Sequence, residues 1–120
     1  MLPNFLVEEQ VVEKEGEGPI VSVGAAAGKT VMLTLGITAV KEQQSLDVQI
    51  FGSADGADFG TKPITVFPQK FYTGTYTILL DLAAAPDVQY LRAKWKTGRW
   101  GHWTDAPMFR FYVFAETATD

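Results

Sequence analysis

The segment 90–103, YLRAKWKTGRWGHW, gathers the side chains best suited to bind an anionic or sugar-bearing ligand. It holds all three tryptophans, the single histidine and four of the ten lysines and arginines in the 120-residue chain. Aromatic faces stack on sugar rings, and guanidinium groups bind carboxylates and phosphates through paired hydrogen bonds. The residues expected to contact a ligand or partner are Arg92, Lys94, Lys96, Arg99, Trp100, His102 and Trp103.

Alternation in VQYLRAKWK (88–96) predicts how these side chains are presented. Successive side chains of a strand point to opposite faces, so Arg92, Lys94 and Lys96 project from one face at intervals of about 6.5–7 Å. The tryptophans beyond this strand lie among glycines, which is typical of a loop. The residues expected to point inward are Leu91, Ala93 and Trp95.

Two other interpretations need no ligand. The indoles can cap the end of a β-sandwich while the cations line a solvated sheet face. Alternatively, the cations meet the acidic segment 8–17, EEQVVEKEGE, which holds five of the fourteen Asp and Glu residues. We prefer this pairing, within one molecule or between two copies, because charge complementarity fixes register and partner choice.

The sequence gives little support for a catalytic site or a metal site. His102 is the only histidine and there is no cysteine, so carboxylates would have to complete any zinc site. No serine lies in a nucleophile elbow. Asp55 and Asp58 of SADGADFG supply too few oxygens for calcium, and Asp-Gly predicts a hairpin turn instead. GAAAGKT (24–30) lacks the phosphate-loop frame and predicts a hairpin connection. We therefore expect no enzyme activity, no catalytic residue, no metal and no cofactor.

Composition limits the class of protein. With 47% hydrophobic and 20% charged residues, the chain has the composition of an ordinary soluble globular protein. A net charge of −4 argues against nucleic-acid binding. The first residues, MLPNFLVEEQ, lack the pattern of a signal peptide, and no apolar run approaches the roughly 20 residues of a membrane span. The expected protein is soluble, cytoplasmic and without a membrane partner.

Period-two alternation dominates the chain and predicts the fold. Apolar and polar residues alternate in short segments that turn residues separate, which indicates an all-β protein. We expect a single domain over 1–120: a two-sheet antiparallel β-sandwich of jelly-roll or Greek-key type, with about eight strands. Turns are expected at Gly16, Gly18 and Pro19, and at most one helical turn in LAAAP (82–86). The expected strands lie within 5–12, 19–24, 29–40, 45–51, 63–67, 74–82, 88–96 and 108–116.

Two further segments suggest contact with a partner. MFRFYVFAE (108–116) is apolar on both faces, which predicts a central or interface strand. VFPQKFYTG (66–74) places Phe67, Phe71 and Tyr72 in one aromatic loop, which we interpret as an apolar patch for another subunit. Phe71 and Tyr72 are therefore secondary candidates for partner binding.

The segments LDVQIFGSADGADF and GTYTILLDLAAAPDVQYLRAKW resemble discoidin-like sandwiches (coagulation factor 5/8 type C, galactose-binding-like). The resemblance covers residues 45–96, and the family's usual cysteine pair is absent. It implies a jelly-roll sandwich that binds sugars or lipid head groups through loops at one end. The residues that carry it are Ser53, Asp55, Gly56, Phe59, Asp81, Tyr90, Leu91 and Arg92.

The function expected from these observations is that of a non-enzymatic binding or structural module. It acts mainly through protein–protein contact, with a second copy of itself or with another protein. The alternative is a carbohydrate-binding module that uses the tryptophan and basic loop, residues 95–103.

Overall fold

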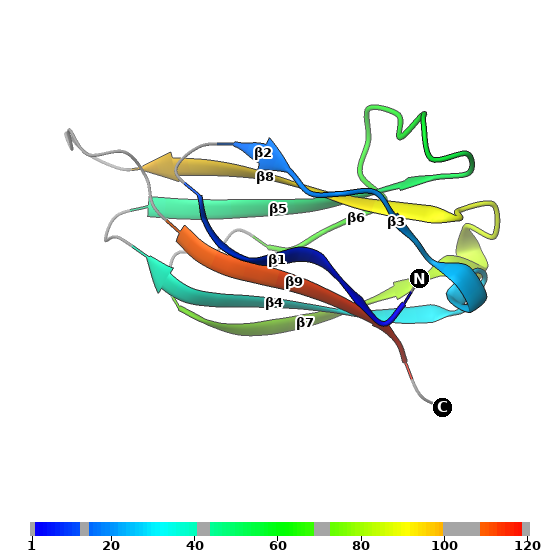
Figure 1. The fold of residues 1–120 in the computed structure, drawn as a ribbon, viewed down its shortest axis with the longest axis horizontal. Coiled ribbons are helices and arrows are strands. Elements are labelled where there is room, and N and C mark those ends of the chain that lie inside the picture. Colours follow the sequence, from blue (N-terminus) through cyan, green and yellow to red (C-terminus); the bar gives the residue numbers. More distant parts are fainter. Residues whose placement is uncertain (1, 13–14, 41–43, 69–72, 100–108, 119–120) are drawn as a thin grey trace.

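Two stacked β-sheets make up the protein in this computed structural model, which describes residues 2–12, 15–40, 44–68, 73–99 and 109–118 (Figure 1). Sheet A has the order β1 (Asn4–Val12), β9 (Phe109–Thr117), β4 (Thr30–Val40), β7 (Gly74–Asp81). Sheet B has the order β2 (Gly16–Glu17), β8 (Tyr90–Arg99), β5 (Gln44–Ser53), β6 (Thr65–Val66), and β3 (Val21–Ser22) also pairs with β8. All of these pairings are antiparallel, so the predicted all-β sandwich is confirmed.

The strand pairing is nested from the ends of the chain towards its middle. The first strand, β1, pairs with the last, β9, and they lie side by side in Figure 1. Next, β2 and β3 pair with β8, then β4 with β7, and finally β5 with β6. Further pairings of β4 with β9 and of β5 with β8 join these pairs into the two sheets. This nesting is the jelly-roll topology.

Close packing explains the glycines before β3, where the prediction of a turn was wrong. Gly16 is paired with Trp95 inside β2, and a Cβ on Gly16 would lie 2.8 Å from the Trp95 ring. A Cβ on Gly18 would collide with the backbone carbonyl oxygen of Leu6 on β1. These glycines therefore let backbone and ring approach closely, and β2 and β3 continue along one side of β8.

The connection at 24–29 also differs from expectation. It includes a short 3-10 helix, η1 (Gly24–Ala26), and runs from β3 in sheet B to β4 in sheet A. It is thus a crossing between sheets and not a hairpin. The helical turn expected near residue 82 is confirmed as η2 (Leu82–Ala84), whose start is capped because the Ala83 N–H donates to Asp81 Oδ1 at 2.9 Å.

The core lies between the sheets and follows the predicted alternation. On β8, Leu91 and Ala93 are fully buried and Trp95 is 7% exposed, so the predicted inward face of this strand is confirmed. Alternate residues of the central strands β4 and β9 are likewise buried. They are Val31, Leu33, Leu35 and Ile37 on β4, and Phe109, Phe111, Val113 and Ala115 on β9.

Candidate functional site

The predicted basic row, Arg92, Lys94 and Lys96, lies on the outer face of sheet B. Because Leu91, Ala93 and Trp95 point into the core, these cations point away from it. Arg92 and Lys94 are half-buried and Lys96 is exposed. The presentation expected from the alternation is therefore found.

Glu17 of the acidic segment lies beside the basic row. Its carboxylate is 3.6 Å from the Arg92 guanidinium and 3.9 Å from Lys94 Nζ. Arg92 Nε also donates a hydrogen bond to the Gly18 carbonyl oxygen at 2.9 Å. The preferred pairing of the basic row with the chain's own acid thus occurs within one molecule, and β2 holds it in place through its pairing with β8.

Aromatic rings occupy the space beneath two of these cations. Lys94 Nζ lies 4.5 Å from the centre of the Phe51 ring, and Arg92 Cζ lies 5.8 Å from the centre of the Phe59 ring. Phe51 is only 5% exposed although it belongs to the outer face of the sheet. A cation over an aromatic face is stabilised by the ring's electron density. Arg92 and Lys94 are therefore structural members of this face, whether or not a ligand binds there.

A shallow hollow of about 360 Å³ adjoins the row. Its lining mixes Glu15 and Glu17 with Lys94 and Lys96. Opposite charges at such close range neutralise one another, so the hollow lacks the single sign of potential that concentrates a charged ligand.

Several predicted contact residues lie outside the part of the chain that the structure describes. These are Phe71, Tyr72, Trp100, His102 and Trp103, and the side chain of Arg99 at the end of β8. Their proposed roles stay predictions. Phe67, which we grouped with the aromatic loop, is 3% exposed and belongs to the core.

Asp55 organises the connection between β5 and β6. Its Oδ1 accepts hydrogen bonds from the Ala57 and Asp58 N–H groups, at 2.8 and 3.0 Å, and from the Ser53 hydroxyl at 2.9 Å. The bonds from Asp58, Ala57 and Ser53 lower the pKa of Asp55 from 3.8 to about 2. The carboxylate thus stabilises a turn. This connection, residues 54–64, is longer than the tight Asp-Gly hairpin that the sequence predicts.

Within the described ranges, no group of three or more His, Cys, Asp or Glu side chains is placed to hold a metal ion.

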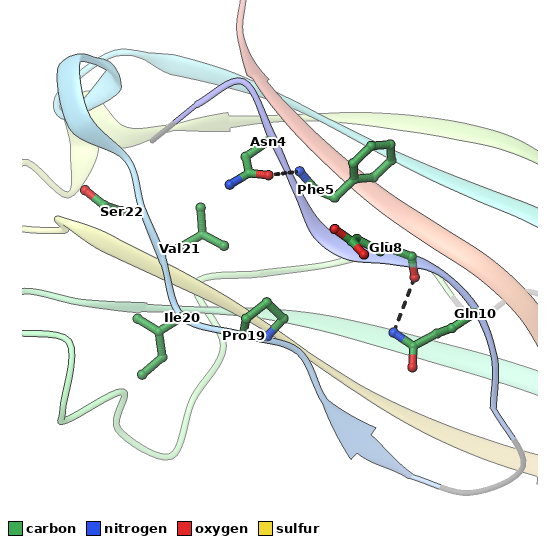
Figure 2. Close-up of a pocket in the computed structure, with 8 residues that line it drawn as sticks. All are labelled: Asn4, Phe5, Glu8, Gln10, Pro19, Ile20, Val21 and Ser22. Atoms are coloured by element: carbon green, nitrogen blue, oxygen red, sulfur yellow. Dashed lines mark hydrogen bonds between the residues drawn. The ribbon is translucent and has the colours of Figure 1, made fainter.

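A hollow of about 460 Å³ lies at the seam where the edge strand β1 of sheet A passes residues 19–22. Figure 2 shows the residues that line it. Asn4 Oδ1 accepts the Phe5 N–H at 2.8 Å, and the Gln10 amide donates to the Glu8 carbonyl oxygen at 3.3 Å. The opposite wall is formed by Pro19, Ile20, Val21 and Ser22. Asn4 and Gln10 thus each use one atom of the amide group in a bond to nearby backbone.

A different surface, on sheet A, carries partly exposed aromatic rings. The inward residues of β9 fill the core, so Arg110, Tyr112, Phe114 and Glu116 lie on the outer face of the sheet. Phe5 of β1 joins them: its ring centre is 4.9 Å from that of Phe114 and 6.0 Å from that of Tyr112. Both ring pairs meet edge to face, an arrangement that favours aromatic contact. We call the surface formed by Phe5, Tyr112 and Phe114 the aromatic face.

The aromatic face is open to solvent and slightly concave. Phe5 is 40% exposed, and the three rings border a hollow of about 370 Å³ together with Glu9 and Thr34. Leu79 on β7, the most exposed of the large apolar residues described at 64%, also belongs to sheet A, but β4 lies between its strand and β9. Thr34 on β4 and Thr77 on β7 lie in the same row as Phe114, so the rings and Leu79 are separate apolar features of this face.

Gly36 and the ion pair between Arg110 and Glu9 border the aromatic face. The Tyr112 ring lies directly over Gly36, where any Cβ would collide with it. Arg110 Nε is 3.1 Å from Glu9 Oε2, and the Thr38 hydroxyl donates to the same oxygen at 2.8 Å. Arg110 keeps 56% of its side chain exposed in spite of this ion pair.

The sequence contained one signal for this surface. The segment 108–116 is apolar on both faces, and β9 is indeed a central strand, between β1 and β4. A two-layer sandwich buries only one face of each sheet, so the aromatic residues of the second face remain at the surface. The sequence pattern does not single out Phe5, Tyr112 or Phe114 as site residues, because it does not show that β1 lies beside β9.

Comparison with known proteins adds no assignment: no protein-family model matches the chain, and no curated protein matches it in sequence. The resemblance to discoidin-like sandwiches stays a prediction, since jelly rolls serve many unrelated functions. Among the described residues, no helix has the length and apolar character to cross a membrane.

Proposed function

We propose that this protein is a non-enzymatic binding or structural module that acts through protein–protein contact and associates with itself. The aromatic face carries this proposal. The exposed face of an antiparallel sheet is usually polar, whereas this one presents the rings of Tyr112 and Phe114 packed against Phe5, all three partly exposed. Contiguous apolar surface of this kind marks interaction sites in soluble proteins.

The kinds of residue on the aromatic face also fit protein contact. Tyrosine, phenylalanine and arginine are enriched in the centres of protein interfaces. The aromatic face supplies tyrosine and phenylalanine, and Arg110 at its rim lies next to Tyr112 on the outer side of β9. The basic row is less suited, because Glu17 and the rings of Phe51 and Phe59 already satisfy Arg92 and Lys94.

The outer face of sheet A is large enough for a stable protein–protein contact. Four strands about 4.8 Å apart and roughly 30 Å long cover a plan area on the order of 500 Å². Accessible surface exceeds the plan area beneath it, so the whole outer face of sheet A, of which the aromatic face is one part, is of the order that stable interfaces need, roughly 800 Å² per partner.

Sedimentation velocity across a range of protein concentrations tests this function. We expect the wild-type chain to associate, and Phe5→Ser or Phe114→Ser to shift it towards monomer. Val66→Ser is the matched control, since it removes an exposed apolar side chain, 46% exposed, from sheet B. A wild-type chain that stays monomeric at all concentrations contradicts self-association.

Carbohydrate binding is the second candidate, and the hollow of the aromatic face favours it. Rings that flank a hollow of about 370 Å³ can contact the apolar side of a sugar, while Thr34 and Glu9 offer polar groups to its hydroxyls. The version of this hypothesis that uses loop 95–103 loses Trp95, which is buried. A glycan array probed with wild type, Phe114→Ser and Thr34→Val tests it; the absence of binding to any glycan rejects it.

A further inference from the structure

The outer side of β9 has an ordered sequence of chemical types. Along the strand, Arg110, Tyr112, Phe114 and Glu116 present a cation, two rings and an anion. This order is its own complement when the strand is reversed: the cation then faces the anion, and each ring faces a ring. Such self-complementarity suits an isologous two-fold interface, in which residue i of one copy contacts residue j of the other and residue j contacts residue i.

We infer that two copies of the chain pack their aromatic faces together about a two-fold axis that crosses β9 at Val113. This inference rests on the proposed self-association and specifies its geometry. The two β9 strands run antiparallel across the interface. Arg110 of each copy then meets Glu116 of the other, and Tyr112 meets Phe114.

Distances along the strand allow these contacts. Arg110 and Glu116 are six residues apart, which is about 20 Å, so each lies about 10 Å from the axis. Packed sheets are rotated by about 30°, which displaces the facing ends of the two strands by roughly 5 Å. Long, flexible Arg and Glu side chains at the rim can span that displacement.

Both charged groups are available for a second molecule. The Glu9 carboxylate contacts Arg110 through Nε, and the guanidinium has further N–H donors on its terminal nitrogens. Glu116 is half-exposed and makes no ion pair with any residue in the described ranges. Arg110 can therefore bind Glu9 of its own chain and Glu116 of the other copy at the same time.

The charges also exclude the other two-fold arrangement. If the axis ran along β9, each residue would face its own copy, and Arg110 would meet Arg110 while Glu116 met Glu116. Like charges in contact across an interface are strongly unfavourable. The order of charges thus selects the antiparallel arrangement.

Charge reversal tests this geometry in sedimentation equilibrium. Glu116→Arg and Arg110→Glu should each weaken self-association by about tenfold or more, because the two-fold axis doubles every repulsive contact. An equimolar mixture of the two variants, and the double variant, should both recover near wild-type affinity. Glu116→Arg is the more informative single change, since Arg110→Glu also breaks the ion pair with Glu9.

Controls separate this inference from the proposed function. Lys96→Glu reverses an exposed charge on sheet B and should leave association unchanged, and thermal unfolding checks that each variant is folded. If the wild type is monomeric, the proposed self-association and this geometry both fail. If the wild type associates but the reversals have no effect, or the mixture does not recover, this geometry is wrong while self-association stands.

Discussion

The indole of Trp95 packs edge to face against the ring of Phe111, with the ring centres 5.5 Å apart and an angle of 78° between the planes. Trp95 comes from β8 in sheet B and Phe111 from β9 in sheet A, so this contact joins the two layers. It also sets which way β8 faces. Trp95 points inward, and the basic row must therefore point outward.

Replacing Trp95 by Ala is expected to lower the free energy of unfolding by about 3–5 kcal/mol, because it leaves a large cavity between the sheets. Urea denaturation measures this change. Lys96→Ala is the control, since Lys96 is the exposed neighbour on the same strand, and its effect should stay within about 0.5 kcal/mol. Equal effects of the two substitutions would contradict the inward position of the indole.

Removal of the Glu17 charge should have a small effect that depends on salt. Glu17→Gln is expected to cost about 0.5–1 kcal/mol at low ionic strength, since its partners Arg92 and Lys94 keep 26% and 39% of their side chains exposed. In about 1 M salt the loss should shrink, because screening then acts within about 3 Å. Glu15→Gln removes the same charge from an exposed carboxylate outside the ion pairs described, and should change stability less. The cis pairing is refuted if both variants behave alike.

Asp55 should titrate near pH 2 in the folded protein, which carboxyl NMR can measure directly. The folded-state pKa lies below the ordinary value of 3.8, so ionised Asp55 stabilises the fold, and this contribution is lost as the pH falls from about 4 through about 2. Ser53→Ala removes one hydrogen-bond donor and should raise the pKa of Asp55. A midpoint near 3.8 in the wild type would show that the turn does not hold the carboxylate as described.

Gly36→Ala should disturb the aromatic face without removing a ring. The new Cβ would collide with the Tyr112 ring and displace it. Because this ring is half-exposed and can swing outward, we expect a stability loss of only about 1 kcal/mol, but weaker self-association in sedimentation velocity. Val66→Ser on sheet B, away from the proposed contact, is the control. Unchanged association of Gly36→Ala would show that Tyr112 is not part of the contact.

The sequence alone determined which residues of β4, β5 and β8 point into the core. The β-strand has a side-chain period of two wherever it occurs, so local alternation was enough to predict that Leu91, Ala93 and Trp95 point inward. The all-β class followed from the same period and from the turn residues between strands. Glycines were harder to interpret, because the same residue permits a turn or a close approach. At Gly16 and Gly18, only the packing against Trp95 and Leu6 shows that the glycine permits a close approach and not a turn.

Only the tertiary structure decided which strands are neighbours and therefore which side chains share a surface. Pairing β2 with β8 brings Glu17 to Arg92, and pairing β1 with β9 brings Phe5 to Phe114. In a jelly roll the first strand lies beside the last, so these residues are far apart in the chain and no local pattern links them. Register between distant strands depends on burial summed over the whole sandwich, which a short segment does not contain.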